Sequence, residues 1–303
     1  MQKPTDMQSL KRFSKRLLKG KAFRKSEFGT GWSDMTVRGA LKMRASRDAG
    51  QRRAPARLDL PAENGKGAGE PPVRIFIGTE PAQHRAERVL LWSIYRNRNV
   101  GRHYEIYLMK DLAGFDRRKW KTGFTAYRYA IPEFTGFQGR AIYNDVDQIY
   151  LADPARLFDL DMAANAVLAV ESRDTSVMLM DCARLEELWT IEDIGRISDG
   201  KLHTPMLRKL RERHLIANLD GRWNARDHEY DPDSSCLLHY TILHTQPWQP
   251  FPRDLRYRRN ANAEAWTALE DEADAARFAP AWKTQASRSY GEMDAIFTIV
   301  ADE

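Results

Sequence analysis

The sequence predicts an α/β fold, in which the strands of a central sheet alternate with helices along the chain. Three compact apolar segments support this class, namely VRIFIG at 73–78, YEIYLM at 104–109 and AIYN at 141–144. Short apolar runs of this kind are typical of strands that are buried on both faces. The segments between them predict helices, and such alternation is typical of a sheet with parallel strands.

The first strand and the segment after it predict the opening of a nucleotide-binding unit. The first apolar run ends at Gly78, and TEPAQHRAERVLLWSIYRN then places Ala86, Val89, Leu90 and Ile94 at helical spacing. A strand, a turn and a helix in this order open a nucleotide-binding α/β unit. The second strand is followed by a helical segment around FTAYRYAI, which leads into the third strand.

The third strand ends at two carboxylates, Asp145 and Asp147. Residues at this spacing face the same side of an extended chain, so both can turn toward one cation while Val146 points into the core. A divalent ion held by carboxylates suits a diphosphate leaving group, because it neutralises the charge that develops as the bond breaks. The same triplet occurs at 159–161 and 231–233, where the context indicates a helix end and a turn.

The segment CLLHYTILHTQPW at 236–248 supplies a third candidate ligand. It is an apolar strand that ends at His239, followed by a connection that closes with Pro247 and Trp248. Imidazole is a competent ligand of Mn²⁺ and similar ions. The alternative is that His239 is a surface residue or a hydrogen-bonded core residue, and composition does not distinguish it from the six other histidines.

The sequence lacks the apolar segments that would predict a membrane-spanning helix or a secretory signal. No run of about 18 apolar residues occurs, and the start MQKPTDMQSLKRF has no apolar core. We therefore expect a cytoplasmic protein. The two cysteines, Cys182 and Cys236, lie beside apolar residues without metal-ligand spacing, and we expect buried free thiols.

Positive charge is concentrated at the N-terminal end of the chain. Residues 1–70 carry 17 Lys or Arg and 7 Asp or Glu, a net charge of +10, whereas the rest of the chain has a net charge of −4. Residues 46–72 are rich in Gly, Pro, Ala and charge without periodicity, which predicts a flexible linker. The predicted organisation is a basic amphipathic arm at 1–45, this linker, and one folded domain at 73–303.

The arm contains a predicted basic amphipathic helix, because apolar residues recur at spacings of three to four among lysines and arginines. These apolar residues are Met7, Leu10, Phe13, Leu17 and Leu18. One interpretation is that residues 1–25 contact an anionic membrane surface, which would make the protein peripheral on the inner membrane. The alternative is a helix packed on its own domain or a solvated arm. Nucleic acid is the least favoured partner.

Six segments, taken in order, resemble glycosyltransferases of the family 8 type and their bacterial relatives. They are RIFIGTEP, TAYRYAIPEF, GRAIYNDVDQIYLADPARLFD, TSVMLMDC, GRWNARD and LLHYTILHTQPW, within residues 73–251. The resemblance implies a GT-A fold, that is, a Rossmann-like mixed sheet flanked by helices. It also implies transfer of a hexosyl group from a UDP-sugar, with retention of anomeric configuration and help from Mn²⁺ or Mg²⁺.

The resemblance implies roles for individual residues. Asp145, Asp147 and His239 would hold the metal ion, and Arg128 would contact the donor and act in catalysis. Asp174 is a second candidate for a catalytic contact. The residues expected to contact the donor are Gly78, Thr79, Glu80, Arg128, Asp145, Val146 and Gln246.

Two departures from the family pattern affect the expected site. Gln246 stands where the family often has a Lys, so phosphate stabilisation must come from the metal, from Arg128 or from another cation. The triplet at 174–176 is Asp-Thr-Ser, where the family has Asn-x-Gly. Asp174 and Asp227 are candidates for contacts with the acceptor or with sugar hydroxyls, and the alternative is that they cap turns.

The predicted function is therefore a metal-dependent retaining glycosyltransferase that uses a UDP-sugar and a saccharide or glycolipid acceptor, such as a cell-surface glycan. Two alternatives stay open. A catalytically idle GT-A module would bind UDP weakly or without metal, and a sugar-nucleotide nucleotidyltransferase would bind a nucleoside triphosphate better than UDP.

Overall fold

The structure of the 303-residue chain is a computed structural model, and it describes residues 53–63, 69–117, 120, 122–171, 174–196, 203–252, 255–278 and 298–300. The predicted arm at 1–45 lies outside the described residues. Its helix and its membrane contact therefore stay predictions.

Strands and helices alternate along most of the described chain. The strands are β1 (Ala56–Leu60), β2 (Val73–Gly78), β3 (Tyr104–Met109), β4 (Arg140–Asp145), β5 (Gln148–Tyr150), β6 (Val167–Glu171), β7 (Asp174–Asp181), β8 (Ile216–Asn218), β9 (Ala225–Arg226), β10 (Leu237–His239) and β11 (Thr298–Val300). The α-helices are α3 (His84–Asn97), α4 (Ile131–Phe134), α5 (Ala155–Phe158), α6 (Ile191–Arg196), α7 (His203–Glu212) and α8 (Ala263–Ala275). Short 3₁₀ helices are η3 (Pro81–Gln83), η5 (Tyr127–Ala130), η6 (Ala183–Leu185), η7 (Gly221–Asn224), η8 (Asp227–Glu229) and η9 (Leu243–Thr245).

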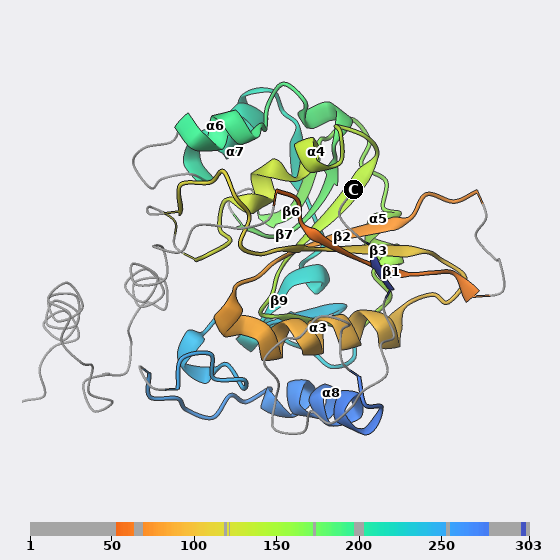
Figure 1. Ribbon diagram of the computed structural model, residues 1–303, viewed down its shortest axis with the longest axis vertical. Helices are drawn as coiled ribbons and strands as arrows, with labels where there is room; N and C mark the ends of the chain where they lie inside the picture. The colour runs from red at the N-terminus through yellow and green to blue at the C-terminus, as the bar shows by residue number, and fades with distance from the viewer. Residues whose placement is uncertain are drawn as a thin grey trace, which may run out of the picture.

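The strands form two sheets. The larger sheet has the order β11-β1-β3-β2-β4-β7-β6-β8, and the smaller sheet has the order β5-β10-β9. In the view of Figure 1, α3 and α8 lie below the strands of the larger sheet, and α6 and α7 lie above them. This arrangement confirms the predicted α/β class, with a mixed sheet flanked by helices.

The register of the central strands brings several strand ends to one edge of the larger sheet. β2 pairs in parallel with β3 and β4, so that Gly78 lies opposite Met109 on one side and Asp145 on the other. β7 runs antiparallel to β4, and its first residues extend past the end of β4. The carboxyl ends of β2, β3 and β4 and the start of β7 therefore meet at this edge, where ligands of α/β sheets bind.

Strand β1 corrects the prediction that residues 46–72 form a flexible linker. β1 pairs antiparallel with β3 along its whole length, and Leu58 and Leu60 are buried. Arg57 and Asp59 alternate with these leucines, which is the pattern of a strand with one buried face. The surrounding Gly, Pro and charged residues obscured this short alternation. The folded part of the chain begins before residue 73.

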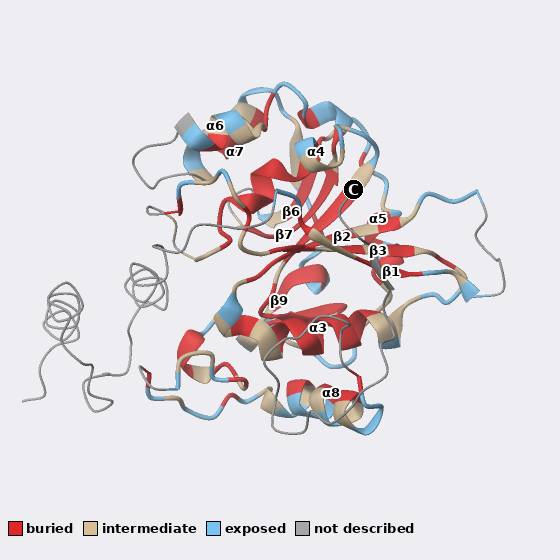
Figure 2. Cartoon of the chain, in the orientation of Figure 1, coloured by how far each residue is buried: buried red, intermediate tan, exposed pale blue. Residues whose placement is uncertain are grey.

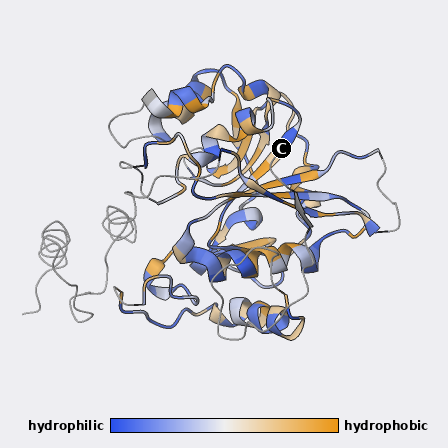
Figure 3. Cartoon of the chain, in the orientation of Figure 1, coloured by the Kyte–Doolittle hydropathy of each residue, from blue (hydrophilic) through white to orange (hydrophobic). Residues whose placement is uncertain are grey.

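The core lies on the strands and on the sides of the helices that face them, where buried residues gather in Figure 2 and hydrophobic residues in Figure 3. The four apolar residues predicted to face the core from the first helix are all buried in α3, and α3 packs against α8 and β5. Cys182 and Cys236 are buried free thiols, as predicted. Among the described helices, none has the length and apolar character that crossing a membrane requires.

Candidate functional site

The candidate site forms where the chain turns from β4 into β5. The backbone N–H of Val146 donates to the carbonyl of Gly78 at 3.1 Å, which fixes the turn against the end of β2. The carbonyl of Asp147 accepts from the N–H of Tyr240 at 2.9 Å. Since β5 pairs antiparallel with β10, with Gln148 opposite His239, the end of β10 lies beside this turn.

The turn and the end of β10 bring Asp145, Asp147 and His239 together, as the sequence predicted for a metal site. Each offers one ligand atom, and these atoms all lie within 4.8 Å of one another. The Nε2 atom of His239 is 3.2 Å from Oδ1 of Asp147. Asp147 and His239 are buried, and Val146 between the two carboxylates packs in the core.

The donor set fits a divalent ion such as Mn²⁺ or Mg²⁺, because it combines two carboxylates with one imidazole. Two ligands on opposite sides of Mg²⁺ lie about 4.2 Å apart, since each is about 2.1 Å from the ion. Ligand atoms that all lie within 4.8 Å of one another are compatible with this separation.

Asp145 is held by two donors. Arg128 donates from Nη2 to Oδ1 of Asp145 at 2.7 Å, and the hydroxyl of Tyr143 donates to the same oxygen at 2.6 Å. Arg128 also donates to the carbonyl of Thr125 and to both oxygens of Thr175, and its guanidinium lies 4.4 Å from the centre of the Tyr143 ring. The contacts with Thr125 and Thr175 thus fix the guanidinium of Arg128, and the guanidinium in turn orients Asp145.

Gly78 makes this arrangement sterically feasible. A Cβ atom at this position would overlap the Tyr143 hydroxyl and would lie 2.6 Å from the Phe124 ring. Both are far closer than normal van der Waals contact. Glycine at the end of β2 therefore lets Tyr143 reach Asp145.

His239 is oriented by a chain of hydrogen bonds. Its Nδ1 is 2.8 Å from Oδ1 of Asn224, and the Asn224 amide donates from Nδ2 to Oδ2 of Asp174 at 2.9 Å. A carboxylate only accepts, which fixes the orientation of the amide and requires the His239 proton on Nδ1. Without an ion, Asp147 favours a proton on Nε2, and loss of that proton makes the Nε2 lone pair available to a metal ion.

Gln246 is the third group that supports the site. It donates from Nε2 to Oδ2 of Asp147 at 3.1 Å and to the carbonyl of Tyr240 at 2.9 Å. The family often has a lysine at this position. In this chain the neutral amide of Gln246 contacts the carboxylate of Asp147 and adds no positive charge.

Burial and charge shift the pKa values of two of the candidate ligands. Burial raises the pKa of Asp145 above its usual 3.8, and Arg128 offsets only part of this effect. Burial alone would lower the pKa of His239, but the carboxylates of Asp147 and Asp145 outweigh it and raise the pKa above 6.5. The site therefore has a negative potential that favours a cation.

The other residues predicted to contact the donor lie at the same edge but have protein partners. The hydroxyl of Thr79 donates to the buried carboxylate of Glu87 at 2.8 Å, and Lys110 donates to the same carboxylate at 2.9 Å. Glu80 accepts from the N–H of Gly123 at 2.9 Å. Contact of this turn with a donor stays a prediction.

The structure places Asp174 and Asp227 in local hydrogen-bond networks. Asp174 accepts from the backbone N–H of Ser176 at 3.0 Å, and also from the Ser176 hydroxyl. Asp227 accepts from the N–H and the hydroxyl of Thr241, at 2.8 and 2.7 Å. This geometry agrees with the turn-capping alternative, and Asp174 is linked to the cluster through Asn224. Contact of Asp174 or Asp227 with a substrate stays a prediction.

A second group of potential metal ligands lies away from this edge, on β1, on β3 and directly before β3. Asp59, His103 and Glu105 bring their ligand atoms within 4.8 Å of one another. Arg57 bonds to Asp59 at 2.9 Å and to Glu105 at 2.8 Å. One guanidinium bridges both carboxylates and the two strands that carry them, so we assign the group to sheet stabilisation.

The supporting roles of Tyr143, Asn224 and Gln246 were not predicted. Asn224 was visible only as part of the segment GRWNARD, and Tyr143 only as a strand residue. The contact of Tyr143 with Asp145 could have been predicted from spacing. Tyr143 lies two residues before Asp145, so both side chains lie on the same face of the strand. No spacing in the sequence relates Asn224 to His239.

The chain resembles several known proteins. No family model matches it. Protein CDI of Arabidopsis thaliana is 30% identical over 110 residues, and the match covers 33% of this chain and 41% of that protein. The plant protein is thus matched over less than half of its length.

Solved structures of glycosyltransferases are similar to the chain at low identity. The apo form of GlyE from Streptococcus pneumoniae TIGR4 shares 17% identity over 66% of this chain and 60% of that chain, with a TM-score of 0.48. The bifunctional glycosyltransferase WbbM shares 12% identity over 69% and 53%, with a TM-score of 0.48. The galactosyltransferase LgtC, in complex with donor and acceptor sugar analogs, shares 11% over 66% and 96%, with a TM-score of 0.43. All three scores lie below 0.5.

Proposed function

We propose that the protein is a metal-dependent glycosyltransferase with a GT-A fold. The observation that carries this proposal is the convergence of Asp145, Asp147 and His239 at the carboxyl-end edge of the sheet, with their ligand atoms within 4.8 Å of one another. A nucleotide donor bound at this edge would have its diphosphate beside the two carboxylates. Such a site needs a divalent cation, because carboxylates and phosphates otherwise repel one another.

The proposed donor is a UDP-sugar, the transferred group is a hexosyl group, and the anomeric configuration is retained. The segments that resemble family 8 glycosyltransferases support these details. The proposed acceptor is a hydroxyl group of a saccharide or glycolipid, such as a cell-surface glycan. The acceptor oxygen forms the new bond to the anomeric carbon, the sugar–phosphate bond breaks, and the hydroxyl proton leaves with the phosphate.

The side chains of the site position the groups that this reaction needs. A cation bound to Asp145, Asp147 and His239 would neutralise charge on the departing UDP. Arg128 acts in this proposal as a positioning residue, since it holds Asp145 at 2.7 Å. Asn224 holds His239 in the tautomer that leaves Nε2 available.

Calorimetric titration of UDP, with and without Mn²⁺, tests the proposal on the native chain and on Asp147→Ala. We expect UDP to bind only with Mn²⁺ and to lose this binding in the variant, because one of three metal ligands is gone. Asp161→Ala is the matched control, since Asp161 is an exposed aspartate in another Asp-x-Asp triplet. It should bind like the native chain.

Other results would contradict the proposal in distinct ways. Equal UDP binding with and without Mn²⁺, or no UDP binding, would indicate an idle nucleotide-binding or assembly module. Tighter binding of UTP than of UDP, together with release of pyrophosphate from UTP and a sugar phosphate, would indicate a nucleotidyltransferase. If UDP binds as expected, NMR of the product anomer then tests retention.

A further inference from the structure

A pocket of about 440 Å³ lies at the other end of the β5 and β10 pair from His239. Its volume is within the range of small-molecule sites. The residues that line it are Leu151, Ala152, Arg156, Arg222, Tyr230, Pro232, Asp233, Ser234, Ser235 and Cys236. None of these residues belongs to the predicted metal or donor site.

The pocket is separated from the metal cluster by the length of β10. Cys236 lines the pocket directly before this strand, and His239 ends the strand. Three residues of strand span about 10 Å. The pocket wall is held by backbone bonds, since the carbonyl of Cys236 accepts from Leu151 at 2.9 Å and from Ala152 at 3.2 Å. The pocket is therefore a distinct place on the molecule with a defined wall.

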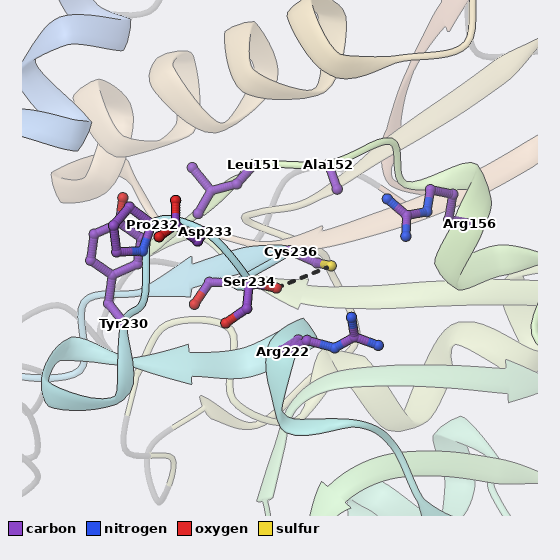
Figure 4. Close-up of a pocket in the computed structure, with 10 residues that line it drawn as sticks. Leu151, Ala152, Arg156, Arg222, Tyr230, Pro232, Asp233, Ser234 and Cys236 are labelled. Atoms are coloured by element: carbon purple, nitrogen blue, oxygen red, sulfur yellow. Dashed lines mark hydrogen bonds between the residues drawn. The ribbon is translucent and has the colours of Figure 1, made fainter.

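Two arginines give one end of the pocket a capacity to bind an anion. Figure 4 shows the guanidinium groups of Arg156, from α5, and Arg222 on the side of Cys236 that is away from Tyr230. Arg156 is exposed and has no ion pair within the described ranges. Arg222 bonds through Nε and Nη2 to one oxygen of Asp220, at 3.0 and 2.9 Å, so its Nη1 group remains for another acceptor. Guanidinium groups suit carboxylates and phosphates.

The opposite end of the pocket has the features of a site for a hydroxylated ring. Figure 4 shows Tyr230, Pro232 and Asp233 grouped there. The C–H groups of a sugar ring can pack on the electron-rich face of a tyrosine ring. A carboxylate such as that of Asp233 accepts from sugar hydroxyls. The Ser235 hydroxyl oxygen accepts from the N–H of Asp231 at 3.0 Å, which leaves its proton available to donate.

We propose that this pocket binds an acidic saccharide, with the anionic group at Arg156 and Arg222 and the sugar ring against Tyr230. The proposal goes beyond the transfer reaction, and it is supported by the residues that line the pocket. It assigns a second saccharide site to the chain, at a distance from the metal cluster. An acidic sugar residue of a longer glycan would be held there while another part of the glycan is free.

Ligand-observed NMR titration of the full chain with glucuronate tests this proposal, with glucose as the neutral counterpart of the same ring. We expect glucuronate to bind at least about tenfold more tightly than glucose, as a hydrogen bond to a charged group predicts. Glucose 6-phosphate is the third probe. Its affinity relative to glucuronate tells whether a phosphate-bearing or a carboxylate-bearing sugar is preferred.

Variants then locate the binding. Arg156→Gln should lower the preference for glucuronate over glucose, because it removes one of the two positive charges without removing the pocket. Arg208→Gln, at an exposed arginine of α7, should leave the preference unchanged. Equal binding of all three sugars, no binding of any, or an undiminished preference in Arg156→Gln would overturn the proposal.

Asp147→Ala separates this proposal from the proposed function. Glucuronate should bind this variant as it binds the native chain, since the pocket is about 10 Å from the cluster along β10. Loss of glucuronate binding in Asp147→Ala would place the sugar at the metal cluster and overturn the second site. If Asp147→Ala loses UDP binding but still binds glucuronate, the pocket proposal is supported. The pocket proposal also holds if the native chain binds glucuronate but transfers no sugar.

Discussion

The two ends of the β5 and β10 pair carry arginine–aspartate contacts of almost equal length in very different surroundings. At the metal cluster, Arg128 is 2.7 Å from Asp145, and the two side chains are 6% and 17% exposed. At the pocket, Arg222 is 2.9 Å from Asp220, and the two side chains are 53% and 50% exposed. The contact distance is therefore a poor guide to the role of either pair.

Burial explains the difference. A buried charge needs fixed partners because water cannot solvate it, and the cluster supplies them through Tyr143, Asn224 and Gln246. Exposed arginines keep their hydration and can exchange one partner for another. The cluster is thus suited to hold a cation in one geometry, and the pocket is suited to bind an anionic ligand reversibly.

Replacement of Arg128 is the largest expected perturbation. Arg128→Ala would leave the carboxylate of Asp145 in a buried site without its cationic partner. We expect the free energy of unfolding to fall by about 3–5 kcal/mol, as for other broken buried pairs. Urea unfolding measures this change.

Arg222→Ala is the matched control for the exposed pair. Because the Arg222 side chain is 53% exposed and solvated by water, we expect the urea midpoint of Arg222→Ala to equal that of the native chain. Equal losses in both variants would contradict the assignment of the difference to burial.

Replacement of Asn224 has a smaller and more specific expected effect. Asn224→Ala removes the acceptor that holds the His239 proton on Nδ1, so the ring can change its tautomer and orientation. We expect the affinity for Mn²⁺ to fall by about 10–100-fold, as for other residues that orient metal-binding histidines. Calorimetry with Mn²⁺ alone measures it.

Asn260→Ala provides the control, because Asn260 is also buried but bonds to Asp227 and Thr245. Its Mn²⁺ affinity should match that of the native chain. A similar loss in both variants would attribute the effect to general loosening of the fold rather than to His239.

The smallest expected effect concerns pH. Burial tends to raise the pKa of Asp174, but hydrogen bonds from Ser176 outweigh it and hold the pKa below 3.8. A lowered folded-state pKa stabilises the fold above pH 3.8, and this stabilisation is lost as the pH falls through the folded-state value. The difference in unfolding free energy between the native chain and Asp174→Asn should therefore shrink from pH 6 to pH 3.

Asp220→Asn gives the comparison at the exposed end. The pKa of Asp220 is also lowered, by its hydrogen bond from Arg222, but the group is solvated in both states. Its pH dependence should be weaker than that of Asp174→Asn. If the unfolding free energy of Asp220→Asn depended on pH more strongly than that of Asp174→Asn, the exposed pair would be coupled to folding.

Local patterns were sufficient for much of the fold and for part of the site. The apolar runs of β2, β3 and β4 and the helical spacing in α3 each lie within a few residues, and all were predicted. Asp145 and Asp147 were predicted because strand end and side-chain direction are local properties. His239 was a candidate because it ends an apolar strand, and the family resemblance distinguished it from the other histidines. β1 was missed because five residues carry little periodic signal.

By itself, the sequence determined where strands and helices form and which carboxylates end a strand, because backbone geometry and side-chain periodicity act over short distances. Only the tertiary structure decided which distant groups meet. The pairing of β5 with β10 brings His239 to Asp147 at one end and Cys236 to Leu151 at the other. Such contacts depend on strand register and on burial of the whole core, and no short stretch of sequence contains that information.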